Sequence, residues 1–183
     1  MTALLEINDV TKRFGGLTAV KNATFTLQKG EFTGILGPNG AGKTTLFNLL
    51  TGFMPPTSGT ITFNGEALQS LAPYKIVNRG MARTFQLCRP FVGMNLLENV
   101  LVACMSPRAH VDRDKEERAR HLLEQVGLGG RGLEPVETLP YGDLRRLEIA
   151  RALATRPDLL LLDEPFAGLG SSEIEPLAQL IKR

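Results

Sequence analysis

The N-terminal part of the chain carries the alternation of apolar and polar positions that is typical of half-buried strands. Residues 23–27 and 60–63 place apolar side chains at every second position. Residues 4–10 form a further predicted strand, and Asn64-Gly65 is a strong hairpin signal. Residues 32–36 predict a short buried strand that runs directly into a glycine-rich loop.

From residue 44 onward, apolar residues recur at the spacing of helices. Residues 44–51 predict a helix that Gly52 ends. A second helix is predicted to be capped by Asp112 and to end at Gly127. Its apolar face consists of Ala119, Leu122, Leu123 and Val126. Residues 144–153 carry the same spacing and predict a third helix.

The C-terminal part combines a leucine run with one more helix. Residues 159–162 are all leucine, as in a strand that is buried on both faces of a parallel sheet. Residues 172–175 read as a capping box that opens a last helix. Strands and helices in this order predict an α/β fold with an early antiparallel part.

Composition and charge exclude several classes of protein. The 183 residues are 43% hydrophobic and 22% charged, an ordinary balance for a single globular core. A net charge of +2 argues against a dedicated nucleic-acid surface. The charges between residues 108 and 120 are mixed in sign, as on a solvated helix face. Two cysteines without a CxxC motif fit a reducing compartment, and we expect no membrane span or signal peptide.

Residues 37–44 match the phosphate-loop pattern G-x-x-x-x-G-K-[ST]. They are Gly37, Pro38, Asn39, Gly40, Ala41, Gly42, Lys43 and Thr44. Glycines let successive backbone N–H groups converge on an anion, and the helix that follows adds its positive dipole end. Lys43 would supply a charge for the phosphates, and the Thr44 hydroxyl is a hard ligand for Mg²⁺. Thr45 has a weaker claim, since it could be simply the next helical residue.

Two carboxylates, Asp163 and Glu164, follow the leucine run directly. An aspartate at this place in a phosphate-loop enzyme holds Mg²⁺, and a neighbouring glutamate could polarise the attacking water. A strand that ends in exposed acidic residues is common by itself. The phosphate loop is what favours the functional interpretation, because ligands gather at the carboxyl ends of strands in α/β sheets.

With these motifs, the chain resembles the nucleotide-binding subunits of ABC transporters. The order is a phosphate loop, a glutamine at Gln86, a signature-like segment at residues 139–143 and the acidic pair. Residues 12–17, 83–86 and 145–151, with tyrosine at position 141, are similar to importers of branched-chain and other hydrophobic amino acids. The resemblance implies a P-loop NTPase (RecA-like) core with an N-terminal antiparallel part and a helical subdomain. It divides the chain into residues 1–86, 87–154 and 155–183.

The resemblance also implies roles for single residues. Phe14 would stack on adenine, although an isolated phenylalanine is more often a core residue. Gln86 would join Thr44 and Asp163 around Mg²⁺, and Glu164 would be the catalytic base. The signature-like residues would contact the ATP held by a second copy; they are Leu139, Pro140, Tyr141, Gly142 and Asp143. ATP and Mg²⁺ are the implied cofactors.

The implied partners are integral membrane permease subunits and a second ATPase subunit in a head-to-tail dimer. The implied location is cytoplasmic, at the inner face of the membrane, with no nucleic acid bound. A soluble ABC-type ATPase of translation or DNA repair and a P-loop kinase are the other readings. The first usually carries paired domains or a coiled coil, and the sequence has no sustained heptad run.

Three departures from the family pattern open an alternative. Pro140 stands where the family usually has serine or alanine, and Asp143 stands where it usually has glutamine. Gly170 stands where the family has aspartate or asparagine. Asp143 brings a negative charge towards a triphosphate, which Arg145 and Arg146 could offset. The family's switch histidine is missing, since no histidine follows His121. We therefore expect a C-terminally truncated cassette, and the alternative is a nucleotide-binding module with little or no turnover.

Overall fold

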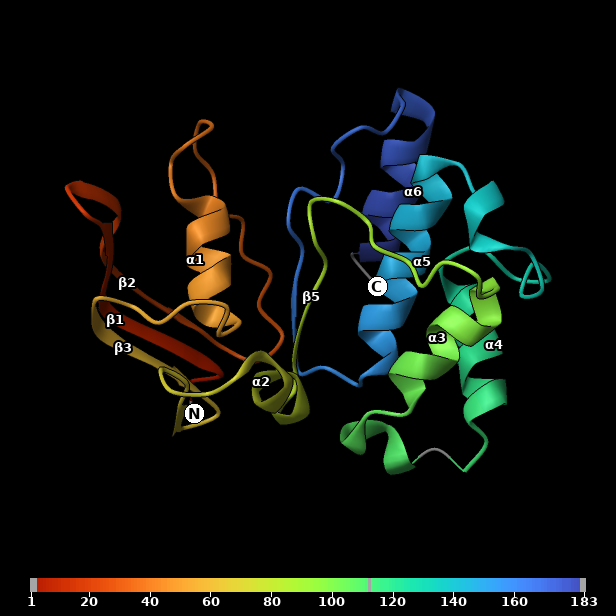
Figure 1. Cartoon of the computed structure of the whole chain (residues 1–183), viewed down its shortest axis with the longest axis horizontal. Coiled ribbons are helices and arrows are strands. Elements are labelled where there is room, and N and C mark those ends of the chain that lie inside the picture. Colours follow the sequence, from red (N-terminus) through yellow and green to blue (C-terminus); the bar gives the residue numbers. More distant parts are fainter. Residues whose placement is uncertain (1–2, 112, 182–183) are drawn as a thin grey trace. The chain divides into compact units, whose positions relative to one another are not determined.

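The computed structural model describes residues 3–111 and 113–181. The chain forms two compact units, Met1–Val77 and Asn78–Arg183, and each is described by itself. The first runs from red to yellow in Figure 1 and the second from green to blue. Among the described residues, no helix combines the length and the apolar character that a membrane crossing needs.

The N-terminal unit is built on an antiparallel sheet of the order β2-β1-β3-β4. Its strands are β1 (Leu5–Phe14), β2 (Leu17–Leu27), β3 (Ser58–Phe63) and β4 (Glu66–Ala67). The alternating side chains Ile7, Ile61 and Phe63 are buried, which is why the period of two predicted these strands. The hairpin at Asn64-Gly65 is confirmed, with Phe63 paired to Glu66.

Two helices accompany this sheet. Helix α1 (Lys43–Leu50) confirms the helix predicted over residues 44–51 and buries Leu46, Leu49 and Leu50. Helix α2 (Pro73–Arg79) was not predicted, and it reaches the start of the second unit. Gly52 ends α1 at a φ of 73°, where an added Cβ would lie 2.6 Å from the carbonyl oxygen of Leu71.

The buried strand predicted over residues 32–36 is wrong. This stretch has no regular secondary structure, and Phe32 and Leu36 are 79% and 94% exposed. A strand exists only where a neighbour accepts its ladder of hydrogen bonds, and the strands of this unit pair with one another in the order given above. Apolar composition predicts burial but names no pairing partner.

The C-terminal unit contains a parallel pair of short strands, β5 (Met81–Arg83) and β6 (Leu159–Leu161). The pair confirms the parallel strand predicted at the leucine run, although only Leu161 is buried and its two predecessors are half-buried. Strand β5 has only three residues, too few to display a period in the sequence.

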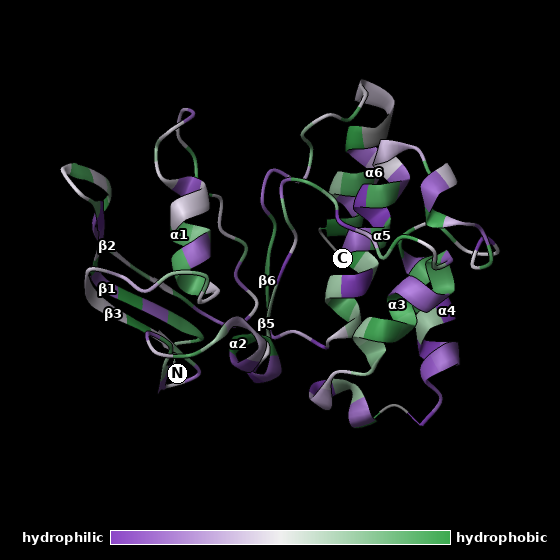
Figure 2. Cartoon of the chain, viewed as in Figure 1, coloured by the Kyte–Doolittle hydropathy of each residue, from purple (hydrophilic) through white to green (hydrophobic). Residues whose placement is uncertain are grey.

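The rest of this unit is mainly helical, and most of its helices contribute to one apolar core. The helices are α3 (Leu96–Cys104), η1 (Pro107–Val111), α4 (Lys115–Gln125), η2 (Val136–Thr138), α5 (Tyr141–Ala154) and α6 (Ser171–Ile181). The core takes Val100 from α3, Leu122 from α4, Leu147 from α5 and Leu177 from α6. These helices carry both hydrophobic and hydrophilic segments in Figure 2, as amphipathic helices do.

Helices α4 and α6 begin at residues other than those that the sequence predicted. Asp112 lies outside the described residues, and α4 takes its cap from Asp114, which accepts a hydrogen bond from the amide of Glu117. The capping box predicted at residues 172–175 is wrong, because α6 already begins at Ser171. A complete capping box stands instead at Asn95 and Glu98, at the start of α3.

Candidate functional site

The loop of residues 37–44 bends at two glycines. Gly40 and Gly42 have φ angles of 82° and 86°, in the left-handed region that glycine enters without strain. The amide of Ala41 donates to the carbonyl oxygen of Pro38 over 3.2 Å and closes a turn. Gly42 is also the N-cap of α1, so the bend leads directly into the helix.

Lys43 points back into this loop. Its ammonium group donates to the carbonyl oxygens of Gly37 at 2.7 Å and Pro38 at 2.9 Å. Helix α1 has no side-chain cap at Gly42 and no acidic residue in its first turn. Its first N–H groups and its positive dipole end therefore lie next to the ammonium group, an arrangement that favours a phosphate. Thr44 and Thr45 occupy the first turn of α1 and are exposed and half-buried.

Gly42 ties this loop to strand β2. A Cβ at Gly42 would lie 2.2 Å from the carbonyl oxygen of Ala19, so only a glycine permits this approach. Phe14 pairs with Leu17 at the tip of the same β1–β2 hairpin and is 47% exposed, so it is not a core residue. The Lys12 ammonium lies 5.3 Å from the centre of its ring, within cation–π range. The β1–β2 hairpin of the N-terminal unit thus contacts the loop through β2 and carries an accessible aromatic ring at its tip.

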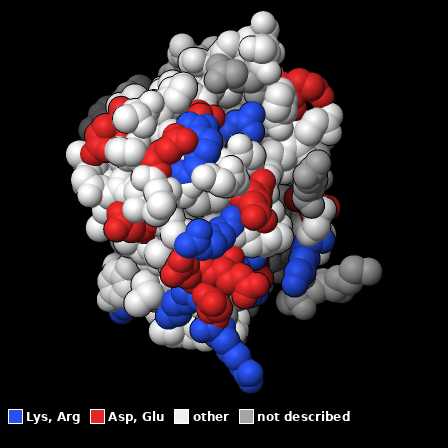
Figure 3. Space-filling model, turned by 90° about the vertical axis from the view of Figure 1, so that its right-hand side faces the viewer, with Lys and Arg blue, Asp and Glu red and all other residues white. Residues whose placement is uncertain are grey.

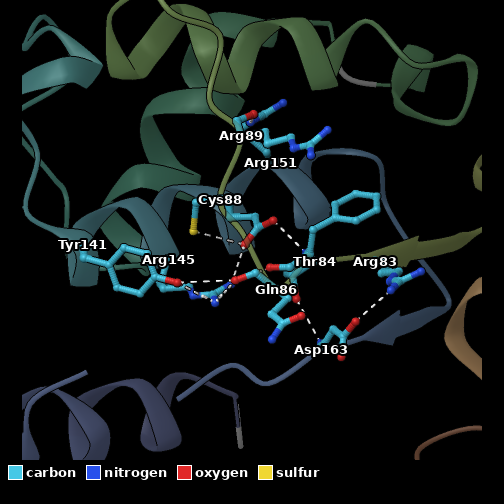
Figure 4. A network of polar contacts seen from close by, with 11 residues as sticks. Arg83, Thr84, Gln86, Cys88, Arg89, Tyr141, Arg145, Arg151 and Asp163 are labelled. Atoms are coloured by element: carbon cyan, nitrogen blue, oxygen red, sulfur yellow. Dashed lines mark hydrogen bonds and ion pairs between the residues drawn. The ribbon is translucent and has the colours of Figure 1, made fainter. Parts of the chain in front are cut away.

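In the C-terminal unit, Asp163 lies just beyond β6 and is 3% exposed. The Arg83 guanidinium donates to its Oδ2 at 2.7 Å, and both side chains are buried. The amide of Asp163 donates to the Thr84 hydroxyl over 3.3 Å. Arg83 is the last residue of β5 and Thr84 follows it, so the parallel pairing of β5 with β6 brings these side chains close to Asp163, as the labelled sticks in Figure 4 show.

Glu164 adopts a φ of 47°, which is uncommon for a residue with a side chain and typical of functional sites. The Gln86 side-chain amide donates to Glu164 Oε2 at 3.2 Å. The structure therefore brings together Gln86 and Glu164, two residues that the sequence related only through a family resemblance.

The signature-like residues open helix α5. Leu139 and Gly142 are buried, and Pro140 is the N-cap without a side-chain hydrogen bond. Tyr141 is 37% exposed. These positions lie at the start of a helix, as the resemblance implied, and their contact with a second copy stays a prediction.

The charge of Asp143 is paired within the chain. Arg131 donates to Asp143 Oδ2 at 2.7 Å, and Arg146 lies 4.0 Å from its Oδ1. Hydrogen bonds to Glu134 and Asp143 raise the pKa of Arg131, so this cation stays charged. The expectation that Arg145 would offset Asp143 is wrong, because Arg145 is buried and forms an ion pair with Glu148. Arg131, 12 residues earlier in the chain, was missed by the sequence analysis.

The predicted magnesium ligands have suitable chemistry. Thr44, Gln86 and Asp163 offer hydroxyl, amide and carboxylate oxygens, which hard cations prefer. Among the described residues, no group of three or more histidine, cysteine, aspartate or glutamate side chains could hold a metal ion. That these three side chains bind Mg²⁺ stays a prediction, and their oxygen atoms are of the kind that this cation prefers.

The face of the helical part in Figure 3 carries Lys and Arg side chains next to Asp and Glu side chains. On α4, Arg120 and Glu116 form an ion pair in which both side chains are more than half exposed. This mixture agrees with the solvated helix face predicted for residues 108–120.

Comparisons with known proteins agree with these motifs. The family described as "ABC transporter" matches residues 20–167. The chain is 42% identical over 197 residues to the high-affinity branched-chain amino acid transport ATP-binding protein BraF of Pseudomonas aeruginosa, covering 98% of this chain and 76% of BraF. It is 42% identical to LivG of Escherichia coli K12, described in the same words, over 97% of this chain and 75% of LivG. The solved ADP conformation of MJ1267, an ATP-binding cassette of an ABC transporter, matches with a TM-score of 0.87 and 29% identity, covering 100% of this chain and 76% of that one.

Proposed function

Because the chain belongs to the ABC transporter family, we propose that it is the ATP-binding and ATP-hydrolysing motor subunit of an importer. The observation that carries this proposal is the loop of residues 37–44, whose glycine bends, helix N-terminus and Lys43 ammonium together favour a polyphosphate. Lys43 and the loop amides would bind the phosphates, and Phe14 would support the adenine ring.

The remaining side chains take the roles that their chemistry allows. Thr44, Gln86 and Asp163 would hold Mg²⁺, which when bound neutralises charge on the phosphates. Arg83 fixes the direction of the Asp163 carboxylate through their buried ion pair. Glu164 would orient and deprotonate the attacking water, with Gln86 beside it.

The transported solute and the partners follow from the relatives. BraF and LivG are described as high-affinity branched-chain amino acid transport ATP-binding proteins, so we assign this chain to import of branched-chain or other hydrophobic amino acids. Its partners would be membrane permease subunits and a second ATPase subunit in a head-to-tail dimer. It would act at the cytoplasmic face of the membrane.

Steady-state phosphate release from Mg·ATP tests the proposal. The unaltered chain should show saturable hydrolysis, and Glu164→Gln should lower kcat about 100-fold or more while ATP still binds, because it removes the general base. Glu116→Gln on the exposed face of α4 is the matched control and should leave kcat unchanged. ATP binding without turnover in the unaltered chain would replace the motor by a nucleotide-binding module.

A further inference from the structure

Side chains on one face of helix α5 form hydrogen bonds with the segment of residues 85–88. Tyr141, Arg145 and Glu148 follow one another at a spacing of four and three residues, so they lie along the same side of the helix. Residues 85–88 belong to neither a strand nor a helix. Their polar backbone groups therefore need partners from elsewhere, and α5 supplies several of them (Figure 4).

Arg145 is at the centre of this hydrogen-bond network and is only 2% exposed. Its two terminal nitrogens donate four hydrogen bonds. Two of them go to the carbonyl oxygens of Phe85 and Gln86, one to Glu148 Oε2 at 3.2 Å and one to the Tyr141 hydroxyl at 2.8 Å. A planar guanidinium holds several acceptors in fixed directions, which the ammonium of a lysine cannot do.

Glu148 accepts further hydrogen bonds from the same segment. Its Oε1 accepts the Phe85 amide at 2.7 Å, and its Oε2 accepts from the Cys88 thiol at 3.5 Å. Glu148 is 9% exposed and ion-paired with Arg145, so both charges are paired where water is largely excluded. The amide and the carbonyl of Phe85 are thereby bound to two neighbouring side chains of one helix.

Tyr141 joins this segment to the loop after Glu164. Its hydroxyl donates to the carbonyl oxygen of Gln86 at 3.4 Å. An added Cβ at Gly168 would lie 3.0 Å from the Tyr141 ring, so the ring packs against that loop. The start of α5 thus contacts both chain segments that carry Gln86 and Glu164.

We propose that Arg145, with Tyr141 and Glu148, is a positioning group that fixes the Gln86 main chain so that its side chain meets Glu164. The contact between Gln86 Nε2 and Glu164 Oε2 is a single hydrogen bond of 3.2 Å, and a small displacement of residue 86 would break it. The consequence for hydrolysis rests on the function proposed above. Rotation or displacement of α5 would then change the alignment of the catalytic carboxylate.

The first arm of the test needs no turnover. The nitrogen-15 resonance of the Gln86 side-chain amide, assigned with Gln86→Met, is recorded with and without Glu164→Ala. In the otherwise unaltered chain Glu164→Ala should shift this resonance, because it removes the hydrogen-bond acceptor. In the Arg145→Met background the shift should vanish. An equal shift in both backgrounds would overturn the proposal.

The second arm separates positioning from folding. Arg145→Met should lower kcat about tenfold or more and leave KM for ATP within about twofold, since misplacement by an ångström affects the chemical step most. Tyr141→Phe keeps the ring against Gly168 and removes only the hydroxyl, so it should fold and lower kcat about threefold. Arg120→Met on the exposed face of α4 is the control and should change neither value.

The two proposals fail in different ways. If the unaltered chain hydrolyses ATP and both Arg145→Met and Tyr141→Phe keep its kcat, the positioning role is wrong and the motor function stands. If the unaltered chain does not hydrolyse ATP, the motor function fails and the resonance of Gln86 alone decides on the positioning role. A loss of native signals in Arg145→Met with an unchanged Gln86 resonance in Tyr141→Phe also counts against it.

Discussion

At the scale of single residues, Gly42 is a position where a side chain fails for two reasons. Its φ of 86° strains any residue with a Cβ, and that Cβ would lie 2.2 Å from the Ala19 carbonyl oxygen. We expect Gly42→Ala to destabilise the N-terminal unit by about 3 kcal/mol, from backbone strain and overpacking together. Hydrogen exchange of the α1 amides measures this loss.

Gly16→Ala is the control for this change. Nothing lies within 4 Å of a Cβ at Gly16, so the stability of the unit should stay the same or rise slightly. Equal protection of α1 in both variants would mean that the contact with Ala19 does not shape the loop.

Cys88 should be an unreactive thiol. Burial raises its pKa to about 12, and the negative charge of Glu148 adds to this shift. Only the thiolate reacts, so at pH 8 alkylation of Cys88 in Cys104→Ser should be on the order of 100-fold slower in the folded than in the unfolded chain. Glu148→Gln should speed the reaction, and equal rates in both states would contradict the shift.

The raised pKa of Cys88 also makes the stability of the fold depend on pH. The unfolded thiol ionises near its ordinary pKa of 9.0, whereas the folded one keeps its proton up to about 12. Below pH 9 the contribution of Cys88 is therefore fully present, and between pH 9 and 12 it is lost because the unfolded state binds fewer protons. Cys88→Ala should make the decline of stability across that interval less steep.

At the scale of elements, sequence periodicity found what lies against a core. Strands β2 and β3 and the apolar face of α4 followed from spacing, because burial on one side leaves a period in the sequence. Strand β5 is too short to show one, and residues 32–36 showed apolar character without a ladder partner.

The candidate site divides in the same way. The phosphate loop and the acidic pair were readable as motifs, since their chemistry depends on neighbours in sequence. Arg83, Arg131 and Arg145 were not, because their partners Asp163, Asp143 and the main chain of residues 85 and 86 come from other elements. An arginine followed three residues later by glutamate on a largely apolar helix was the available signal for Arg145.

The pair of Arg131 and Asp143 joins the loop before η2 to the start of α5. Both side chains are about a quarter to a third exposed, at 34% and 23%, and their atoms approach to 2.7 Å. A double-mutant cycle of Arg131→Met and Asp143→Asn should give a coupling of about 1 kcal/mol in the protection of α5 amides. The exposed pair Glu116–Arg120 should give a coupling of only about 0.3 kcal/mol. If the coupling between Arg131 and Asp143 does not exceed that value, the pairing is refuted.

At the scale of the whole molecule, the chain divides its chemistry between two compact units. The N-terminal unit carries the phosphate loop and Phe14, and the C-terminal unit carries Gln86, Asp163 and Glu164. Under the proposed function, hydrolysis would use both sets of residues, whereas binding of the polyphosphate would depend first on the loop. Binding of ATP is therefore the property that tests the structure of the loop most directly.

Calorimetric titration of the chain with Mg·ATP tests this central claim most directly. The unaltered chain and the control Lys29→Ala, which changes an exposed lysine of a turn, should bind with the same affinity. Lys43→Ala should weaken binding at least about 30-fold, since a hydrogen bond to a charged group contributes about 2 kcal/mol. No saturable binding by the unaltered chain, or equal binding by Lys43→Ala, would contradict the account.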